Sequence, residues 1–308
     1  MTITKDSSSL HKIRSFLPQS VLTALSVLDK ATLDRISEIR LRSQGITTVT
    51  VEGNNRALSV KGLTDDTTLA VRCTKCDIDD FIYKFCKGSV YTHEKSISEN
   101  YIVNEGIRVG FGCTGSNTPG PPSEITSLNI RLARHIPDCS KILMKHVKEN
   151  GFEDGRGILI ISRPGIGKTT FLRDLAIKLS SGIDYQMKRV CVIDERNEIY
   201  MKNIFDNCCI DFLSNIDKCK GIETACRLLS PEIIICDEIS GYDEASKITL
   251  QKNSGVTFIA SFHSDSFTSA LKKTFIRSMF DNGVFSHMYL LERTGSEIKG
   301  TLYKYTND

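Results

Sequence analysis

The chain has 308 residues, of which 40% are hydrophobic and 25% charged, a composition typical of a globular protein with about two domains. Its net charge of only +3 gives no indication of a nucleic-acid partner. No apolar run reaches the roughly 18–20 residues of a membrane span. The 11 scattered cysteines, with no signal peptide ahead of them, predict reduced thiols in a cytoplasm. Cys73 and Cys76 form a lone C-x-x-C pair, which favours coincidence or exposed thiols over a zinc site.

The first part of the chain has the patterns of a small α+β module. Apolar residues recur at spacings of three and four between Ile13 and Leu41, interrupted by Pro18, which predicts one or two amphipathic helices. Residues 77–86 carry the same helical spacing. Alternation of apolar and polar residues predicts short strands over residues 38–42, 47–52, 107–111 and 127–134.

The end of this module is marked by a change of pattern. A loop rich in Gly, Ser and Pro is expected over residues 112–122. A helix predicted over residues 140–148 leads into the second part of the chain. We therefore predict an N-terminal α+β domain over residues 1–137 and a second domain over residues 138–308.

The most informative stretch follows the apolar run 157–161 and precedes a helical pattern over residues 171–179. It reads Ser-Arg-Pro-Gly-Ile-Gly-Lys-Thr-Thr, and a strand, a tight loop and a helix are the context of a phosphate-binding loop. Glycines there let successive backbone N–H groups turn toward one anion at the positive end of the helix. The predicted phosphate-binding residues are Ser162, Arg163, Pro164, Gly165, Ile166, Gly167, Lys168, Thr169 and Thr170.

Three of these residues need separate comment. Lys168 would reach the β- and γ-phosphates, and Thr169 would offer its hydroxyl to Mg²⁺. Ser162 stands where the motif G-x-x-x-x-G-K-[ST] begins with glycine. Because the later glycines, the lysine and the threonine make most of the phosphate contacts, we interpret Ser162 as a tolerated variation. The alternative, an accidental Gly-Lys-Thr in a turn, is disfavoured by the strand and the helix on either side.

Polar side chains follow three further predicted strands. The strand 189–193 is followed by Asp194, Glu195 and Glu198, the strand 232–236 by Asp237 and Glu238, and the strand 257–261 by Phe262 and His263. Acids at the carboxyl ends of buried parallel strands stand where an open sheet presents its ligand site. We therefore expect all three strand ends to face the phosphate-binding loop.

The second of these strands carries the clearest chemistry. Four apolar residues followed by Asp-Glu form the usual second nucleotide motif, in which Asp237 would hold Mg²⁺ through water or a threonine. Glu238 would polarise the attacking water, and His263 would contact the γ-phosphate. A solvated loop is the alternative for the acids after residue 193, and an ordinary surface or core histidine is the alternative for His263.

The order of these motifs resembles that of a known family. The chain is similar to the family of stage III sporulation protein AA, a bacterial relative of type II and type IV secretion ATPases, in residues 162–169, 192–199, 230–239, 260–263, 38–42, 106–110 and 127–134. The most specific part is Asp-Glu-Arg-x-Glu-Ile, which matches the acidic box of secretion ATPases. The resemblance implies an α/β fold, with a RecA-like P-loop NTPase domain of mainly parallel sheet preceded by a smaller α+β N-terminal domain.

The resemblance also implies a function and its residues. The family implies an ATP hydrolase that binds ATP and Mg²⁺ and assembles as a hexameric ring. By the same resemblance the ring lies in the mother-cell cytoplasm and is peripheral to the membrane, where it binds channel proteins of the stage III A complex. Thr169 and Asp237 are the implied Mg²⁺ ligands. Arg131 resembles an arginine supplied from the first domain, whose fork would stabilise charge on the transferring phosphoryl group. The implied catalytic residues are Glu238, Glu195, Glu198, Arg131 and His263.

Several residues depart from the family's pattern. Residues 212–220 replace most of a pattern nearer to Val-Leu-Asp-Gly-Cys-Pro-Lys-Ala-Glu. Tyr200 stands where a small residue is common, Ser264 where glycine is usual, and Arg163 where proline is usual. We therefore expect a divergent member with nucleotide binding intact and with turnover and subunit coupling altered.

The sequence is consistent with three functions. The leading one is an ATPase whose Mg-ATP cycle moves the first domain against the second and energises or assembles a mother cell–forespore secretion or feeding channel. The second is a nucleotide-gated docking or structural component with little turnover. The third is a nucleic-acid-associated, loader-type ATPase with a basic groove formed by Lys272, Lys273, Arg277, Arg131 and Arg134. The near-neutral charge argues against the third, so no direct nucleic-acid partner is expected.

Overall fold

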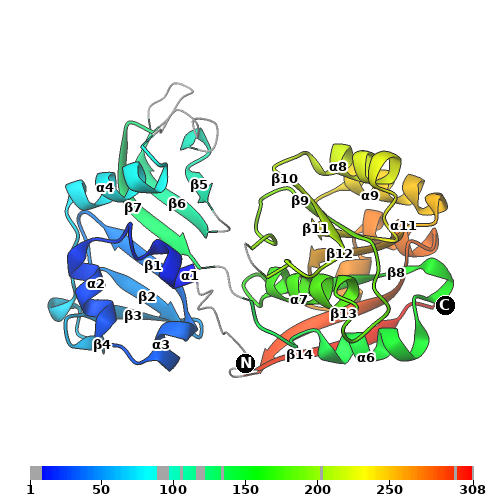
Figure 1. The fold of residues 1–308 in the computed structure, drawn as a ribbon, viewed down its shortest axis with the longest axis horizontal. Helices are drawn as coiled ribbons and strands as arrows, with labels where there is room; N and C mark the ends of the chain where they lie inside the picture. The colour runs from blue at the N-terminus through cyan, green and yellow to red at the C-terminus, as the bar shows by residue number, and fades with distance from the viewer. Residues whose placement is uncertain are drawn as a thin grey trace. The chain divides into compact units, whose positions relative to one another are not determined.

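The computed structural model describes residues 9–88, 97–104, 107–115, 122–132, 135–201, 204–294 and 297–306. The chain divides into two compact units, Met1–Arg134 and His135–Asp308. Each unit contains one seven-stranded sheet (Figure 1). The domain boundary placed between residues 137 and 138 stays a prediction.

The first unit is an antiparallel sheet with helices. Its strands follow the order β4-β3-β2-β1-β7-β6-β5, and each described pair is antiparallel. The helices are α1 (Ser9–Ile13), α2 (Gln19–Ser26), α3 (Lys30–Arg35), the short 3-10 helix η1 (Thr67–Leu69) and α4 (Lys75–Phe85). The strands are β1 (Ile36–Arg42), β2 (Thr48–Val51), β3 (Asn54–Ser59), β4 (Gly62–Thr64), β5 (Tyr101–Asn104), β6 (Ile107–Thr114) and β7 (Glu124–Arg131).

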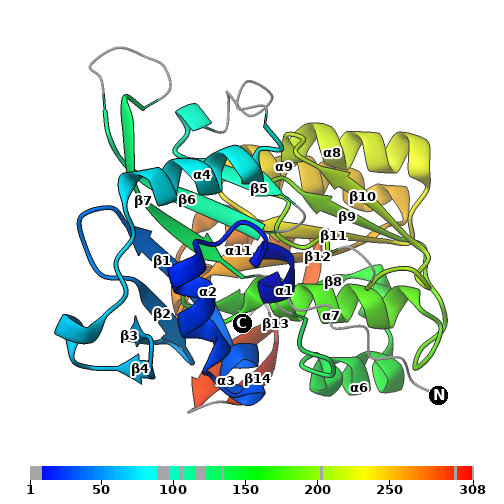
Figure 2. The same cartoon turned by 60° about the vertical axis from the view of Figure 1, so that its left-hand side comes forward.

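The core of the first unit lies between one face of this sheet and its helices. Alternate residues of the strands, such as Ile39 and Leu41 of β1 and Val109 of β6, are fully buried. They form one apolar core together with Phe81 of α4. The helix α4 lies across β7 (Figure 2). The period of two along each strand therefore makes this face apolar.

Two short helices, α2 and α3, lie within residues 13–41, as predicted, and a further helix, α1, ends at Ile13. From Ile36 the chain continues as β1, in which the buried residues Ile39 and Leu41 follow the strand period of two. The helix expected from residue 77 begins at Lys75, since Thr74 and Asp77 form a reciprocal capping box there.

The strand predictions for this unit are also refined. The strand β6 extends to Thr114, so the expected loop begins later, and its residues 116–121 lie outside the described residues. The strand β7 ends at Arg131, and Arg134 likewise lies outside them. The short strands β3, β4 and β5 were not predicted.

The second unit alternates strands and helices along the chain. Its helices are α6 (Lys141–Asn150), η3 (Glu153–Gly155), α7 (Lys168–Ser180), α8 (Lys218–Thr224), the π-helix η4 (Ala225–Leu229), α9 (Tyr242–Gln251), η5 (Lys252–Ser254), α10 (Phe267–Leu271) and α11 (Thr274–Asp281). Its strands are β8 (Gly157–Ser162), β9 (Val190–Asp194), β10 (Ile210–Ser214), β11 (Ile233–Glu238), β12 (Thr257–His263), β13 (Phe285–Thr294) and β14 (Glu297–Lys304). No helix in the described ranges is both long and apolar enough to cross a membrane.

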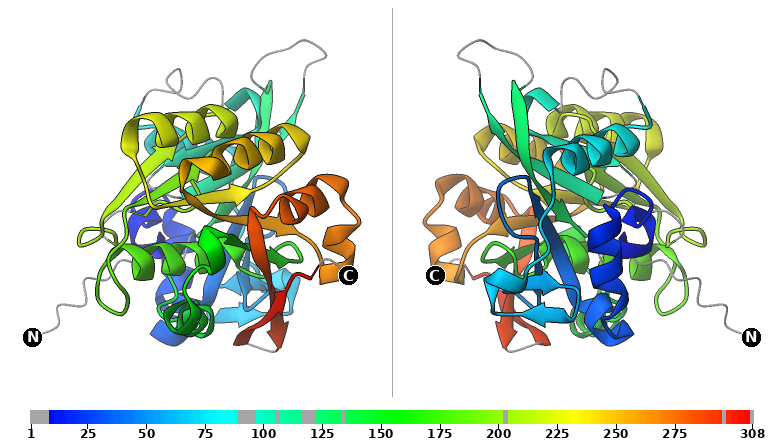
Figure 3. Two further views of the ribbon diagram at one scale, coloured as in Figure 1. Left: turned by 90° about the vertical axis from the view of Figure 1, so that its right-hand side faces the viewer. Right: turned by 90° about the vertical axis from the view of Figure 1, so that its left-hand side faces the viewer.

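The sheet of the second unit is mainly parallel and covered on both faces. Its order is β10-β9-β11-β12-β8-β13-β14, and only β13 and β14 pair antiparallel among the described strands. Helices α6 and α7 pack in the core on one face, and α8, α9 and α11 in the core on the other (Figure 3). Because both faces are covered, β8 is buried along its whole length. The predicted α/β fold with a mainly parallel sheet is confirmed, whereas β10, β13 and β14 were not predicted.

Candidate functional site

The candidate phosphate loop, residues 163–167, connects the end of β8 to the start of α7. Gly165 and Gly167 have φ angles of 78° and 118°, in the left-handed region that residues with a Cβ atom rarely adopt. The first turn of a helix has backbone N–H groups without intrahelical partners, and these groups attract anions. The local sequence therefore forms the strand, loop and helix arrangement that suits a bound phosphate.

Lys168 is a buried cation at the start of α7. Only 7% of the residue is exposed, and burial lowers the pKa of its ammonium to about 8. Its Nζ lies 2.5 Å from Nδ1 of His263 and 3.5 Å from Oγ of Ser162. An ammonium has three donors and no acceptor, so Lys168 is suited to an anion at the loop.

The order of the strands explains which predicted residues meet. β9, β11, β12 and β8 are consecutive neighbours and all run parallel. Their carboxyl ends therefore lie along one edge of the sheet, which is the usual ligand edge of an open α/β sheet. That edge carries Asp194, Glu238, His263 and the candidate phosphate loop.

Asp237 and Glu238 end β11 in different environments. Asp237 is 8% exposed, and burial raises its pKa to about 6. Oε2 of Glu238 lies 3.3 Å from Nε2 of His263 and 3.9 Å from Nη1 of Arg196. His263 therefore stands between Lys168 and Glu238, accepting from the ammonium at Nδ1 and facing the carboxylate with Nε2.

The surroundings of the loop fit a magnesium nucleotide. Oγ of Ser261 on β12 is buried without a hydrogen-bond partner in the described structure. Phe262 packs in the core on the α8 side, so alternation along β12 places Ser261 on the α7 side. Asp237 lies near α7 as well, because its charge affects the pKa values of Lys168 and Arg173. An unpaired buried hydroxyl costs about 1–3 kcal/mol, which a bound water or ligand oxygen would offset. No described group of three or more His, Cys, Asp or Glu could hold a metal, but Mg²⁺ with one carboxylate completes its shell with waters and phosphates.

The acidic loop, residues 195–200, is fixed by two buried charges. The carboxylate of Asp194 accepts hydrogen bonds of 2.8–2.9 Å from the backbone N–H groups of residues 198–200. Arg173 of α7 is 2% exposed and donates to the carbonyl oxygens of residues 198 and 199. The solvated-loop interpretation is therefore wrong for Asp194, which is fully buried and shapes the loop.

Glu195 and Glu198 belong to this acidic loop. The side chain of Glu195 is 40% exposed, and its Oε2 lies 3.7 Å from Nζ of Lys218. The charge of Glu198 contributes to the raised pKa of Asp237. Arg173 and Lys218 were not among the predicted site residues. An arginine within the apolar pattern of α7 was the available signal for Arg173. The signal for Lys218 was that it keeps the lysine of the family's pattern for residues 212–220.

The predicted basic residues are spread over both units. Arg131 lies in the first unit, where its Nε is 3.5 Å from Oε1 of Glu38. Its role toward a nucleotide stays a prediction. The basic residues at positions 272, 273 and 277 are exposed on the second unit, and Arg134 lies outside the described residues. The basic groove therefore stays a hypothesis.

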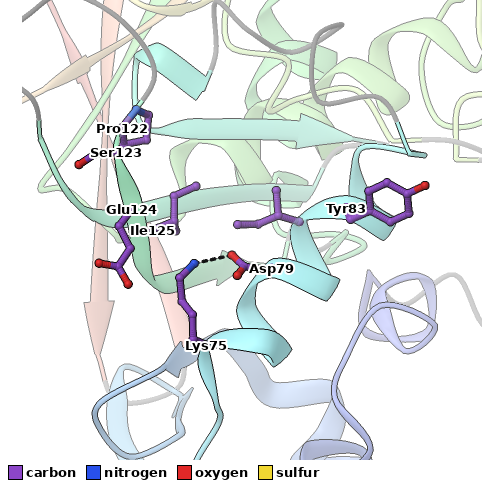
Figure 4. A pocket seen from close by; sticks show the side chains of 8 residues that line it. Lys75, Asp79, Tyr83, Pro122, Ser123, Glu124 and Ile125 are labelled. Atoms are coloured by element: carbon purple, nitrogen blue, oxygen red, sulfur yellow. Dashed lines mark hydrogen bonds and ion pairs between the residues drawn. The ribbon is translucent and has the colours of Figure 1, made fainter.

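The first unit also has a pocket with a cavity volume of about 550 Å³. Figure 4 shows Lys75 and Asp79 of α4 joined as an ion pair, with Glu124 and Ile125 of β7 nearby. The pocket is lined by Lys75, Asp79, Ile82, Tyr83, Pro122, Ser123, Glu124 and Ile125. None of these is a predicted site residue.

The two shifted pKa values predict how nucleotide affinity depends on pH. Below about pH 6 Asp237 becomes protonated and would no longer serve as the predicted Mg²⁺ ligand, and above about pH 8 Lys168 loses its positive charge. Calorimetric titration with Mg-ADP should therefore show the tightest binding between these values, with a loss of up to about tenfold per pH unit outside them. The Asp237→Asn variant distinguishes protonation of Asp237 from protonation of the nucleotide as the cause of weaker binding at low pH. If the affinity of this variant falls at low pH as it does in the wild type, the role of Asp237 is contradicted.

Comparison with solved structures shows where this fold occurs. The chain is similar to the ATPase DotB of Legionella pneumophila with a TM-score of 0.62 and 12% identity, over 92% of this chain and 81% of DotB. The pilus retraction motor PilT with bound ADP gives a TM-score of 0.59 and 12% identity, over 90% of this chain and 82% of PilT. The chain therefore has the fold of these two ATPases, with a candidate phosphate loop at the usual ligand edge of the sheet.

Sequence comparison then gives the family. The family model for "Sporulation stage III, protein AA" matches residues 9–305, so the chain belongs to this family, and the predicted resemblance is confirmed. Stage III sporulation protein AA of Bacillus subtilis (strain 168) is 27% identical over 294 residues, covering 92% of this chain and 91% of that protein. The uncharacterized protein ycf45 of Cyanidium caldarium is 30% identical over 159 residues, covering 48% of this chain and 44% of that protein.

Proposed function

We propose that this protein is a Mg²⁺-dependent ATPase. The observation that carries the proposal is the continuous contact from Lys168 through His263 to Glu238 at the candidate phosphate loop. Lys168 and the backbone N–H groups of the loop would hold the β- and γ-phosphates, while Thr169 and Asp237 would hold Mg²⁺. Bound Mg²⁺ would neutralise charge on the phosphates. Glu238 would then orient and deprotonate the attacking water.

The remaining predicted residues have supporting roles in this proposal. Glu195 and Glu198 would help to position water, because the acidic loop that carries them is fixed at the same edge of the sheet. His263 would exchange its contact with Lys168 for one with the γ-phosphate. Arg131 would stabilise the transferring phosphoryl group, from the same or a neighbouring subunit.

We further propose a cellular setting from the family. The protein would form a homo-hexameric ring in the mother-cell cytoplasm and bind membrane channel proteins of the stage III A complex. ATP turnover would energise or assemble a secretion or feeding channel between mother cell and forespore. The family's sporulation name and the likeness to a protein described as a pilus retraction motor support this setting.

A nucleotide-gated docking component with little turnover is the second candidate. The observation that favours it is the engagement of Glu238 by His263 and Arg196. These two contacts hold the carboxylate that would activate water. In this alternative, nucleotide binding would change the conformation of the protein. The contacts of Glu238 with His263 and Arg196 would persist in the nucleotide-bound state.

Phosphate release from Mg-ATP, measured against protein concentration, tests the proposal. We expect turnover per subunit to rise with concentration and then to level off, because a site completed by a neighbouring subunit forms only in the oligomer. Sedimentation at the same concentrations reports assembly. Background turnover at every concentration, with Mg-ADP still bound, would contradict the ATPase and favour the docking component.

A further inference from the structure

Lys218 is a buried lysine outside the candidate phosphate loop. It lies in the first turn of α8 and is 3% exposed. Its Nζ lies 3.0 Å from Oε2 of Glu244 and 3.7 Å from Oε2 of Glu195, and it donates to the main-chain carbonyl of Glu238. Burying an ammonium is costly unless such partners surround it. One cation thus joins α9, the acidic loop and the end of β11.

The two carboxylate partners of Lys218 are not equivalent. Glu244 is already held by Ser240, whose backbone N–H donates to Oε2 at 2.8 Å and whose hydroxyl donates to Oε1 at 2.7 Å. Glu195 is 40% exposed, and its ion pair in the described structure is the one with Lys218. Glu244 therefore orients Lys218, and Lys218 in turn orients Glu195.

We propose that Lys218 is a positioning residue of the candidate nucleotide site. It holds the Glu195 carboxylate at the end of β11, while the next residue, Arg196, approaches the Glu238 carboxylate at 3.9 Å. Lys218 thereby fixes the acidic loop against the residue proposed to activate water. The inference rests on the proposed ATPase function. Losing this orientation should slow the chemical step more than it weakens nucleotide binding.

The substitution Lys218→Met tests the role, because methionine keeps much of the apolar stem and removes the charge. We expect kcat for Mg-ATP hydrolysis to fall about tenfold while KM changes by less than about twofold. Lys247→Met is the matched control, since Lys247 pairs with Glu223 and the proposed site does not use it. This control should keep kcat within about threefold of the wild-type value. A loss of kcat in Lys247→Met as large as in Lys218→Met would show a general effect of removing a lysine ion pair and overturn the proposal.

A double-mutant cycle with Glu195→Gln tests the contact itself. If Lys218 holds Glu195, Glu195→Gln should lower kcat and shift the melting temperature less in the Lys218→Met background than in the wild type. Additive effects would overturn the inference. If Lys218→Met does not fold, Lys218→Met/Glu244→Gln replaces it, because that pair leaves no unpaired buried carboxylate.

The melting measurements separate the two proposals. A wild-type protein that binds Mg-ADP but releases no phosphate would contradict the ATPase function and, with it, a role of Lys218 in turnover. Non-additive effects of the two substitutions on the melting temperature would even then support the contact by which Lys218 holds the acidic loop. Additive effects in an active enzyme would overturn the role of Lys218 and leave the proposed ATPase function in place.

Discussion

Lys168→Ala should lower phosphate release from Mg-ATP by at least about 100-fold, because the site loses its cation at the transferring phosphate. Mg-ADP should also bind more weakly, since Lys168 is proposed to contact the β-phosphate. The fold should remain, because the ammonium is disfavoured by burial, as its pKa of about 8 indicates. Steady-state phosphate release, calorimetric affinity and thermal melting together check this result.

The matched control for this variant is Lys145→Ala. Lys145 is a well-exposed lysine on α6 with a loose ion pair to Glu149, so its loss should change neither turnover nor melting measurably. Persistent hydrolysis in Lys168→Ala would remove the assigned site. A lowered melting temperature in that variant would show instead that Lys168 supports the fold through His263 and Ser162.

The second large effect is expected for Glu238→Gln. Glutamine keeps the shape of the side chain and removes its basicity, so kcat should fall by about 100- to 1,000-fold, while KM and Mg-ADP affinity change little. Rapid-quench measurement of a single turnover would place the loss in the chemical step. A fall in affinity as large as the fall in kcat would instead assign Glu238 to nucleotide binding.

Glu195→Gln is the comparison that identifies the base. We expect a loss of about tenfold in kcat, smaller than that of Glu238→Gln, because Glu195 is proposed to assist in placing water. A reversed order of the two losses would make Glu195 the base. If neither variant changes a slow phosphate release, the docking component is the better function.

The candidate phosphate loop could be predicted because its signals are contiguous. The apolar strand, the two glycines and the helix with apolar residues at helical spacing follow one another directly, and each depends on local geometry. The same holds for the carboxylates at the ends of β9 and β11, since a continuous apolar stretch followed by acids indicates a ligand edge. Sequence similarity added the family.

The limits of the helices and strands in the first unit were harder to predict from the sequence. The apolar residues between Ile13 and Leu41 fit a helical spacing at several points, yet Ile36 begins β1 because it packs in the core shared by the sheet and its helices. Short helices gain most of their stability from such packing rather than from local propensity. Tertiary packing therefore decides whether this segment forms a helix or a strand.

The sequence by itself determined the class of fold, the phosphate-loop motif, the acidic strand ends and the family. The tertiary structure alone decided which side chains pair with which. Asp194 reads as one acid among several, but it is buried and fixes the acidic loop together with Arg173 of the preceding helix, α7. Lys218 reads as one lysine in a divergent stretch, but the structure makes it a buried cation. The physical reason is that the cost of burying a charge, and the partners that offset it, depend on surroundings set only when distant segments meet.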